Sequence, residues 1–284
     1  MKTLKLILLG LFVFPVAIIA QNQMKSCCAP NISTQNAILA SNNEFAKTHA
    51  EPLPYHLENQ EGNMISIKCK DNKSANAYLI RSTTKSDKYL IVIHEWWGLN
   101  DYIKKESEHL FNDLSHLNVN VIAIDLYDGE SASTREGAQK LMGKMNQARN
   151  ENIINGVLDY LGKDAQVATI GWCMGGSWSL QTAILGGDKI KGCVMYYGFP
   201  EQNMGRLEKI KSPVLGLFAS KDKWITGEVV SQFEKNMNTA GKKVEIHQFD
   251  ADHAFANPSN PVFDEKASKE AYTLAIGFLR EKLK

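Results

Sequence analysis

One cysteine in a glycine-rich turn has the surroundings of a nucleophile. The string GWCMGG at residues 171–176 follows a short apolar run and leads into a second apolar segment, which predicts a strand, a sharp turn and a helix. Side chains at Gly171 or Gly175 would obstruct such a turn, and Cys173 would begin the helix, where the helix dipole favours a thiolate. The backbone N–H of Met174 is then a candidate donor to an oxyanion. The turn predicts a cysteine nucleophile, with a buried structural cysteine as the alternative.

A thiol nucleophile needs a base and an acid, and two later loops supply them. Asp222 and His253 each follow a short apolar run that is typical of a buried strand. Loops that leave the ends of successive strands bring their side chains to one edge of a sheet. In that arrangement His253 takes the thiol proton, and Asp222 holds the imidazole in the required tautomer. Asp250 and Asp252 are alternative acids, but they belong to the same turn as His253.

The hydrophobic pattern predicts the elements that position these loops. Two runs joined by a turn-like Asp-Asn-Lys at 71–73 predict an antiparallel hairpin at the edge of a sheet. Six further short apolar runs alternate with helical stretches, which is typical of a mostly parallel sheet with helices on both faces. Ligands of such α/β folds bind at the carboxyl ends of the strands. The expected strands are 64–70, 75–81, 89–94, 119–125, 167–171, 190–196, 214–219 and 244–249, and the expected helices are 101–117, 134–161, 175–185, 227–239 and 263–283.

Several motifs together resemble those of a known family. They look like the motifs of dienelactone hydrolases, which are cysteine-dependent members of the α/β-hydrolase fold, and the likeness runs from about Ile65 to the C-terminus. The resemblance implies a hydrolase that cleaves a small ester or lactone through a triad of Cys173, His253 and Asp222 and a thioester intermediate. The motifs are HEWWGLN at 94–100, DLY at 125–127, GWCMGG at 171–176, KD at 221–222 and HAF at 253–255.

The same resemblance implies a helper carboxylate and a second oxyanion donor. Glu95 matches the family's glutamate that hydrogen-bonds the resting thiol, and the backbone N–H of Trp96 would be the second donor beside Met174. The residues themselves agree in part, because a carboxyl group flanked by Trp96 and Trp97 at a strand end is easily desolvated, which raises its pKa. A loop carboxylate bonded to backbone amides is the alternative interpretation of Glu95.

Candidate substrate-binding residues match the family less closely. Dienelactone hydrolases hold a substrate carboxylate with two arginines; Arg135 falls where one is expected, whereas Asn257 stands where the second should be. Losing one charge-assisted fork weakens carboxylate recognition by roughly 1.5 to 3 kcal/mol, so a true dienelactone is a poor candidate substrate. A surface position on a helix is the alternative for Arg135. Tyr127 and Phe255 lie just beyond strand ends and are expected to line an apolar active-site mouth.

Composition narrows the class of function. The chain has 284 residues, and 32 Lys and Arg against 31 Asp and Glu give a formal net charge of +1, which argues against nucleic acid as a partner. We expect a monomer that acts on a small molecule. No metal is expected, because His94-Glu95 lacks a second histidine at helical spacing, and no cofactor, because no glycine-rich phosphate loop or dinucleotide fingerprint occurs.

The N-terminus predicts export. Lys2 and Lys5 precede an uncharged apolar run at 6–20, and polar residues follow it, which is typical of a signal peptide cleaved after Ala20. A retained anchor is less favoured, because the apolar run is short for a membrane span. A lipoprotein signal at Cys27 is also less favoured, because charged and polar residues separate this cysteine from the apolar run. The mature chain would then be periplasmic or secreted, with no stable membrane span.

Residues 21–50 are rich in Ser, Thr and Asn and are expected to form a flexible extension before a hydrolase domain at 51–284. The adjacent Cys27 and Cys28 lie in this extension, while the other non-catalytic cysteines lie on expected strands and should be buried. An exported thiol protein with a redox or ligand-binding role is the alternative function, which the absence of a C-x-x-C motif makes less favoured.

Overall fold

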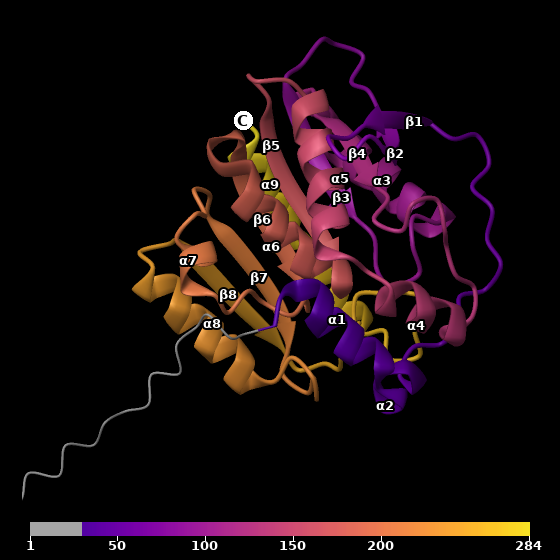
Figure 1. Ribbon diagram of the computed structural model, residues 1–284, viewed down its shortest axis with the longest axis vertical. Helices are drawn as coiled ribbons and strands as arrows, with labels where there is room; N and C mark the ends of the chain where they lie inside the picture. Colours follow the sequence, from indigo (N-terminus) through magenta and orange to yellow (C-terminus); the bar gives the residue numbers. More distant parts are fainter. Residues whose placement is uncertain (1–29) are drawn as a thin grey trace, which may run out of the picture.

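The fold is built on one eight-stranded sheet in the order β1-β2-β4-β3-β5-β6-β7-β8 (Figure 1). The computed structural model describes residues 30–284, so the expected signal peptide, Cys27 and Cys28 lie outside the described residues. The strands are β1 (Asn63–Lys68), β2 (Ser74–Ile80), β3 (Lys88–Ile93), β4 (Asn120–Ile124), β5 (Gln166–Trp172), β6 (Ile190–Tyr196), β7 (Val214–Ala219) and β8 (Val244–Phe249).

Strand directions match the predicted pattern. The strands from β4 across to β8 pair in parallel, and β1 and β2 form an antiparallel hairpin that joins the sheet through β2 and β4. All residues of β4 and β7 are buried, as expected for strands covered on both faces. The mostly parallel α/β architecture with an antiparallel edge hairpin is therefore confirmed.

Helices cover both faces of the sheet. In Figure 1, α5, α6 and α8 lie in front of the strands and α9 lies behind them, where it packs against α3. In α3 the buried residues Ser107, Leu110 and Leu114 fall on one stripe, which is the spacing that a surface helix presents to a core. The helices are α1 (Ile32–Ser41), α2 (Asn43–Lys47), α3 (Asp101–Leu114), α4 (Arg135–Gly143), α5 (Gln147–Tyr160), α6 (Met174–Gly186), α7 (Met204–Leu207), α8 (Gly227–Thr239) and α9 (Glu265–Lys282).

The single helix predicted over 134–161 is wrong, because the structure has two helices there. The first, α4, ends at Gly143, and α5 begins after Asn146. The Asn146 side chain accepts a hydrogen bond from the backbone N–H of Arg149 at 3.0 Å. An N-cap of this kind starts a new helix, and the glycine weakens the end of the preceding one.

The described part of the segment predicted to be flexible, from Pro30 onward, contains α1 and α2 instead. Both helices are capped by asparagine side chains: Asn31 accepts from the N–H of Thr34 at 2.9 Å, and Asn42 accepts from that of Glu44 at 2.9 Å. Phe45 of α2 is fully buried, and α1 packs on α4. Asparagine-rich composition suggested disorder, but these asparagines cap helices.

Two further expectations concern burial and membrane crossing. Cys69 and Cys193 are buried, as predicted. Within residues 30–284, none of the helices is both long and apolar enough to cross a bilayer.

Candidate active site

The turn after β5 places Cys173 at the N-terminus of α6 in an unusual backbone conformation. Its φ of 53° and ψ of −121° lie in a region that side chains rarely adopt. A Cβ on Gly171 would lie 2.1 Å from the carbonyl oxygen of Gly175, and a Cβ on Gly175 would lie 2.3 Å from that of Ile93. Only glycines allow the turn to pack this closely against the neighbouring helix and strand, which explains the spacing seen in the sequence.

The structure brings the predicted nucleophile, base and acid into one hydrogen-bonded line. Cys173 Sγ lies 3.4 Å from His253 Nε2, and His253 Nδ1 lies 2.6 Å from Asp222 Oδ2. The three residues follow β5, β8 and β7, whose carboxyl ends share one edge of the sheet. All three are buried, with 4% exposure for Cys173, 3% for His253 and 5% for Asp222. Solvent therefore reaches the line of side chains poorly.

Asp222 is held in place by its own loop. Its Oδ1 accepts hydrogen bonds from the backbone N–H groups of Trp224 and Ile225, both at 2.9 Å, which leaves Oδ2 for the imidazole. The alternative acids lie elsewhere: Asp250 forms an ion pair with Lys221 at 3.0 Å, and Asp252 is exposed.

The electrostatics of the pair favour a charged imidazole. Burial opposes the charged form of His253, but the negative charges of Asp222 and Cys173 raise the pKa of His253 well above its usual value. Burial likewise opposes ionisation of Asp222, yet the nearby His253 and the loop N–H groups lower the pKa of that carboxyl. The arrangement can therefore accept a proton from the thiol at Nε2 while Asp222 stays ionised.

Glu95 follows β3 and is buried beside the triad, but it does not meet the thiol as the family resemblance implied. Its Oε2 accepts a hydrogen bond from Asn257 Nδ2 at 2.8 Å, and its Oε1 accepts one from Tyr197 Oη at 3.5 Å. Cys173 instead contacts His253. Burial raises the pKa of Glu95 to about 7, partly offset by the bonds from Asn257 and Tyr197. This carboxyl group can exchange a proton near neutral pH.

The two predicted oxyanion donors lie on the loops that flank the nucleophile. Met174 is the first residue of α6, so its N–H is one of the groups that a helix leaves without an intrahelical acceptor. Trp96 lies in the loop after β3, three residues beyond the end of that strand. The N–H of Gly98 donates to the carbonyl of Glu95 and closes a turn around Trp96. In the described part of the chain, neither the Met174 nor the Trp96 N–H donates to another backbone carbonyl.

The candidate substrate-binding residues fall into different environments. Asn257 holds Glu95, and Phe255 is fully buried against the ring of Tyr197 at 5.4 Å. Tyr127 is buried with its ring 4.8 Å from that of His94. Arg135 is the half-buried first residue of α4, and its backbone N–H donates to the Glu51 carboxylate at 3.1 Å. The described contacts do not join the Arg135 guanidinium to the triad.

Sequence reasoning missed the residues that cover the triad. Phe45 of α2 lies with its ring 5.4 Å from that of His253 and 5.2 Å from that of Trp224. The ring of His49 lies 5.6 Å from that of His253 and 4.4 Å from that of Trp96. The capping residues Asn31 and Asn42 are a sequence signal for the helices α1 and α2. No motif in the sequence indicates that this segment packs on the triad.

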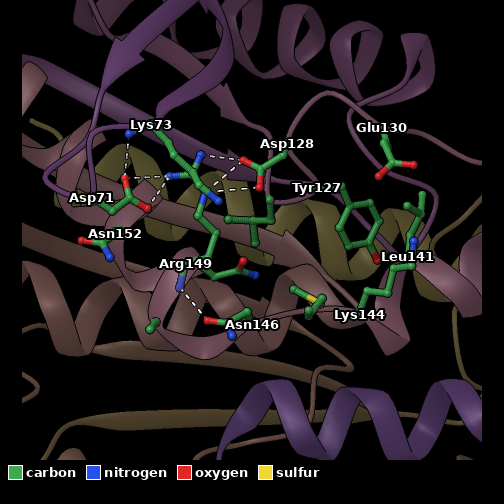
Figure 2. A pocket seen from close by; sticks show the side chains of 14 residues that line it. Asp71, Lys73, Tyr127, Asp128, Glu130, Leu141, Lys144, Asn146, Arg149 and Asn152 are labelled. Carbon is green, nitrogen blue, oxygen red and sulfur yellow. Dashed lines mark hydrogen bonds and ion pairs between the residues drawn. The ribbon is translucent and has the colours of Figure 1, made fainter.

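A separate cavity of about 540 Å³ lies beside the loop after β4 (Figure 2). Tyr127 lines it together with Arg149, whose guanidinium forms ion pairs with Asp71 at 3.0 Å and with Asp128. None of the triad residues lines this cavity. It is therefore not the space in which the triad would act.

Known proteins have similar sequences and a similar fold. The chain is 24% identical over 230 residues to carboxymethylenebutenolidase 1 of Cupriavidus pinatubonensis, which covers 76% of this chain and 95% of that protein. It is 31% identical over 118 residues to the carboxymethylenebutenolidase of Pseudomonas sp. strain P51, covering 41% of this chain and 48% of that one. A dienelactone hydrolase-like promiscuous phosphotriesterase from metagenomic libraries has a similar structure, with a TM-score of 0.64, 20% identity and coverage of 78% and 99%.

The family match spans most of the chain. Residues 75–283 match the dienelactone hydrolase family, and the match leaves α1, α2 and His49 outside it. The sheet order, the parallel core and the edge hairpin agree with the α/β-hydrolase fold of the similar structures. The chain belongs to the dienelactone hydrolase family and is a hydrolase acting on ester bonds.

Proposed function

We propose that the protein hydrolyses a small ester or lactone through a covalent thioester on Cys173. Cys173 Sγ attacks the carbonyl carbon while its proton passes to His253 Nε2. The backbone N–H groups of Met174 and Trp96 stabilise the oxyanion, and the alcohol leaves with the proton from His253. Water then attacks the thioester, His253 takes its proton and returns it to the sulfur, and the carboxylic acid is released.

The observation that carries this proposal is the hydrogen-bonded line from Cys173 through His253 to Asp222. Because the Asp222 carboxylate can only accept, the His253 Nδ1–H must donate to it, so Nε2 faces the thiol at 3.4 Å and carries the lone pair whenever the imidazole is neutral. A general base requires this tautomer at this distance. A structural cysteine would need neither the histidine nor the acid.

Glu95 is proposed as the assisting carboxyl group. Its pKa of about 7 allows it to take up or release a proton as the substrate arrives. To reach the thiol, its side chain would have to leave Asn257 and Tyr197, which hold it in the present arrangement.

We propose that the substrate is small and carries at most one carboxylate. The relatives include carboxymethylenebutenolidases, and this chain uses Asn257 to hold Glu95 rather than presenting a second cation. Arg135 remains the candidate for a single carboxylate contact. If Arg135 serves this role, Arg135→Ala should lower kcat/KM for carboxylate-bearing esters by about ten- to a hundredfold and leave neutral esters unaffected. Equal loss on both would refute it.

The triad is tested by removing the thiol. Cys173→Ala should reduce hydrolysis of small aryl esters to background, whereas Cys69→Ala, which removes another buried thiol, should retain it. Acid quenching of the parent protein during turnover should trap the thioester, and peptide mass spectrometry should then find the added acyl mass on the peptide that contains Cys173. Undiminished turnover by Cys173→Ala would overturn the mechanism.

A further inference from the structure

His49 places a second imidazole beside the proposed nucleophile and its base. One ligand atom from each of His49, Cys173 and His253 can be chosen so that all three lie within 4.8 Å of one another. The three residues are far apart in the sequence, so no metal-binding spacing motif predicts the cluster. All three are buried, and His49 is only 1% exposed. They form a cluster of two nitrogens and one sulfur, the donor types that zinc prefers.

The tautomer of His49 is fixed by its backbone partner. His49 Nδ1 lies 2.9 Å from the carbonyl oxygen of Phe45, which can only accept, so Nδ1 carries the hydrogen. The lone pair is therefore on Nε2, a buried atom that has no hydrogen-bond partner within residues 30–284. A proton on this buried atom would have no acceptor there, so the contacts favour the neutral ring. A neutral imidazole with one nitrogen bonded to a carbonyl is the form in which histidine ligates metals.

The ring of His253 is oriented by a carboxylate. Its Nδ1–H donates to the Asp222 carboxylate, so its Nε2 faces the sulfur. Carboxylate–histidine–metal arrangements are the usual outer support of zinc ligands. The observed separation of 3.4 Å between Sγ and Nε2 is close to the roughly 3.5 Å that tetrahedral bonds of about 2.3 Å to sulfur and 2.0 to 2.1 Å to nitrogen require.

We propose that His49, Cys173 and His253 form a site for a divalent transition ion such as Zn²⁺, with one coordination position left open. Binding replaces the thiol hydrogen with a sulfur–metal bond, and the proton is released to solvent. The ion occupies the sulfur and the imidazole nitrogen that the proposed reaction needs, so bound metal blocks hydrolysis. This consequence rests on the proposed function, whereas metal binding itself does not.

Cobalt spectroscopy tests the site directly, because Co²⁺ bound to a thiolate in a tetrahedral site gives a near-ultraviolet charge-transfer band and strong visible bands. The parent protein should carry Cys27→Ser and Cys28→Ser, so that these adjacent thiols do not contribute. We expect both sets of bands in the parent, loss of the charge-transfer band in Cys173→Ser, and displacement of Co²⁺ by Zn²⁺. Absence of the charge-transfer band in the parent would overturn the proposal.

His49 is tested by two substitutions and a matched control. His49→Phe keeps an aromatic ring of similar packing, and His49→Gln keeps a polar group; each should weaken Co²⁺ binding by more than about tenfold. His116→Phe, which changes an exposed histidine, should bind Co²⁺ as the parent does. Circular dichroism confirms that each variant is folded. Parent-like affinity in a folded His49→Phe protein would refute the role of His49.

Enzyme assays then separate the two proposals. If both hold, Zn²⁺ inhibits aryl-ester hydrolysis by the parent, and inhibition of the His49→Phe protein needs a more than about tenfold higher free Zn²⁺ concentration. If the Cys173 mechanism fails but the site exists, the cobalt bands remain and Zn²⁺ leaves hydrolysis unchanged.

Discussion

Glu95 shows what burial does to a carboxyl group whose neighbours offset the cost of desolvation only in part. The groups facing it are the Asn257 amide, the Tyr197 hydroxyl and His253, and each of them lowers its pKa. Desolvation has the larger effect and raises the pKa to about 7. The unfolded chain would ionise the same group near 4.5. The folded protein therefore binds one proton more than the unfolded protein over this interval.

This difference predicts a loss of stability with rising pH. The contribution of Glu95 is fully present below about pH 4.5 and is lost as the pH rises through about 7, by on the order of 3 kcal/mol in total. Glu95→Gln cannot ionise and should remove this dependence. Urea unfolding of both proteins at intervals from pH 4 to 8 measures it. The difference between the two curves should change across pH 4.5–7 and stay flat above; a flat difference throughout contradicts the raised pKa.

His49 has the opposite effect on how stability depends on pH. Its pKa of about 3 in the folded protein lies below its usual 6.5, so the unfolded chain binds the extra proton between these values. Acid therefore favours unfolding through His49, while it favours folding through Glu95. Comparing each variant with the parent, rather than interpreting the parent curve alone, separates the two groups.

At the scale of elements, α2 is the part of the fold that closes the triad. Phe45 packs edge-on against His253, Trp96 and Trp224, and Cys173 beneath is only 4% exposed. The preceding helix α1 buries several polar side chains, so it gains less from the hydrophobic effect than an apolar helix would. A substrate that reaches the sulfur must therefore move this segment or pass beside it.

Removing the Phe45 ring should open the site. Phe45→Ala is expected to increase the rate at which iodoacetamide labels Cys173 by at least about tenfold, because burying a phenylalanine stabilises a packed element by about 3 to 5 kcal/mol. Peptide mass spectrometry assigns the label. Phe233→Ala, which deletes an equally buried ring in α8, controls for general loosening, and Cys193 reports global unfolding. Equal labelling of Cys173 in both variants would exclude a closing role for α2.

Some elements of the fold could be predicted from the sequence, and others could not. The strands could be predicted because short β-branched and apolar runs favour buried strands. The turn at Cys173 could be predicted because only glycines at 171 and 175 allow the backbone to pack so closely. The break between α4 and α5 and the helices α1 and α2 depend on single asparagine caps, a signal that composition hides. Contacts such as that of His49 with Trp96 arise only from tertiary packing, which no local pattern encodes.

At the scale of the whole molecule, Arg149 joins three parts of the fold. Its guanidinium reaches Asp71 in the hairpin turn, Asp128 in the loop after β4 and the carbonyl oxygen of Ser74 in β2, while its backbone belongs to α5. The side chain is 11% exposed, and Asp128 is about half exposed, so solvent screens part of the interaction.

Arg149→Met should therefore destabilise the protein by about 1 to 3 kcal/mol, because it leaves the Asp71 carboxylate and the Ser74 carbonyl without their partner. Urea unfolding measures the loss. Lys70→Met removes an exposed ion pair between the same hairpin and α5, that of Lys70 with Asp159, and should change stability by less than about 1 kcal/mol. Similar losses in the two variants would contradict the difference in burial.

The order of the triad along the chain has a consequence for synthesis. His253 follows Cys173 by 80 residues, and Asp222 also comes after the cysteine. At about 5 to 20 residues per second, a ribosome adds the histidine roughly 4 to 16 s after the cysteine. During that interval the nascent chain contains Cys173 but not His253, and β7 and β8, which precede the acid and the base, are still being added. A chain whose synthesis stops before residue 253 would therefore lack the base that the proposed mechanism requires, although it already contains the nucleophile.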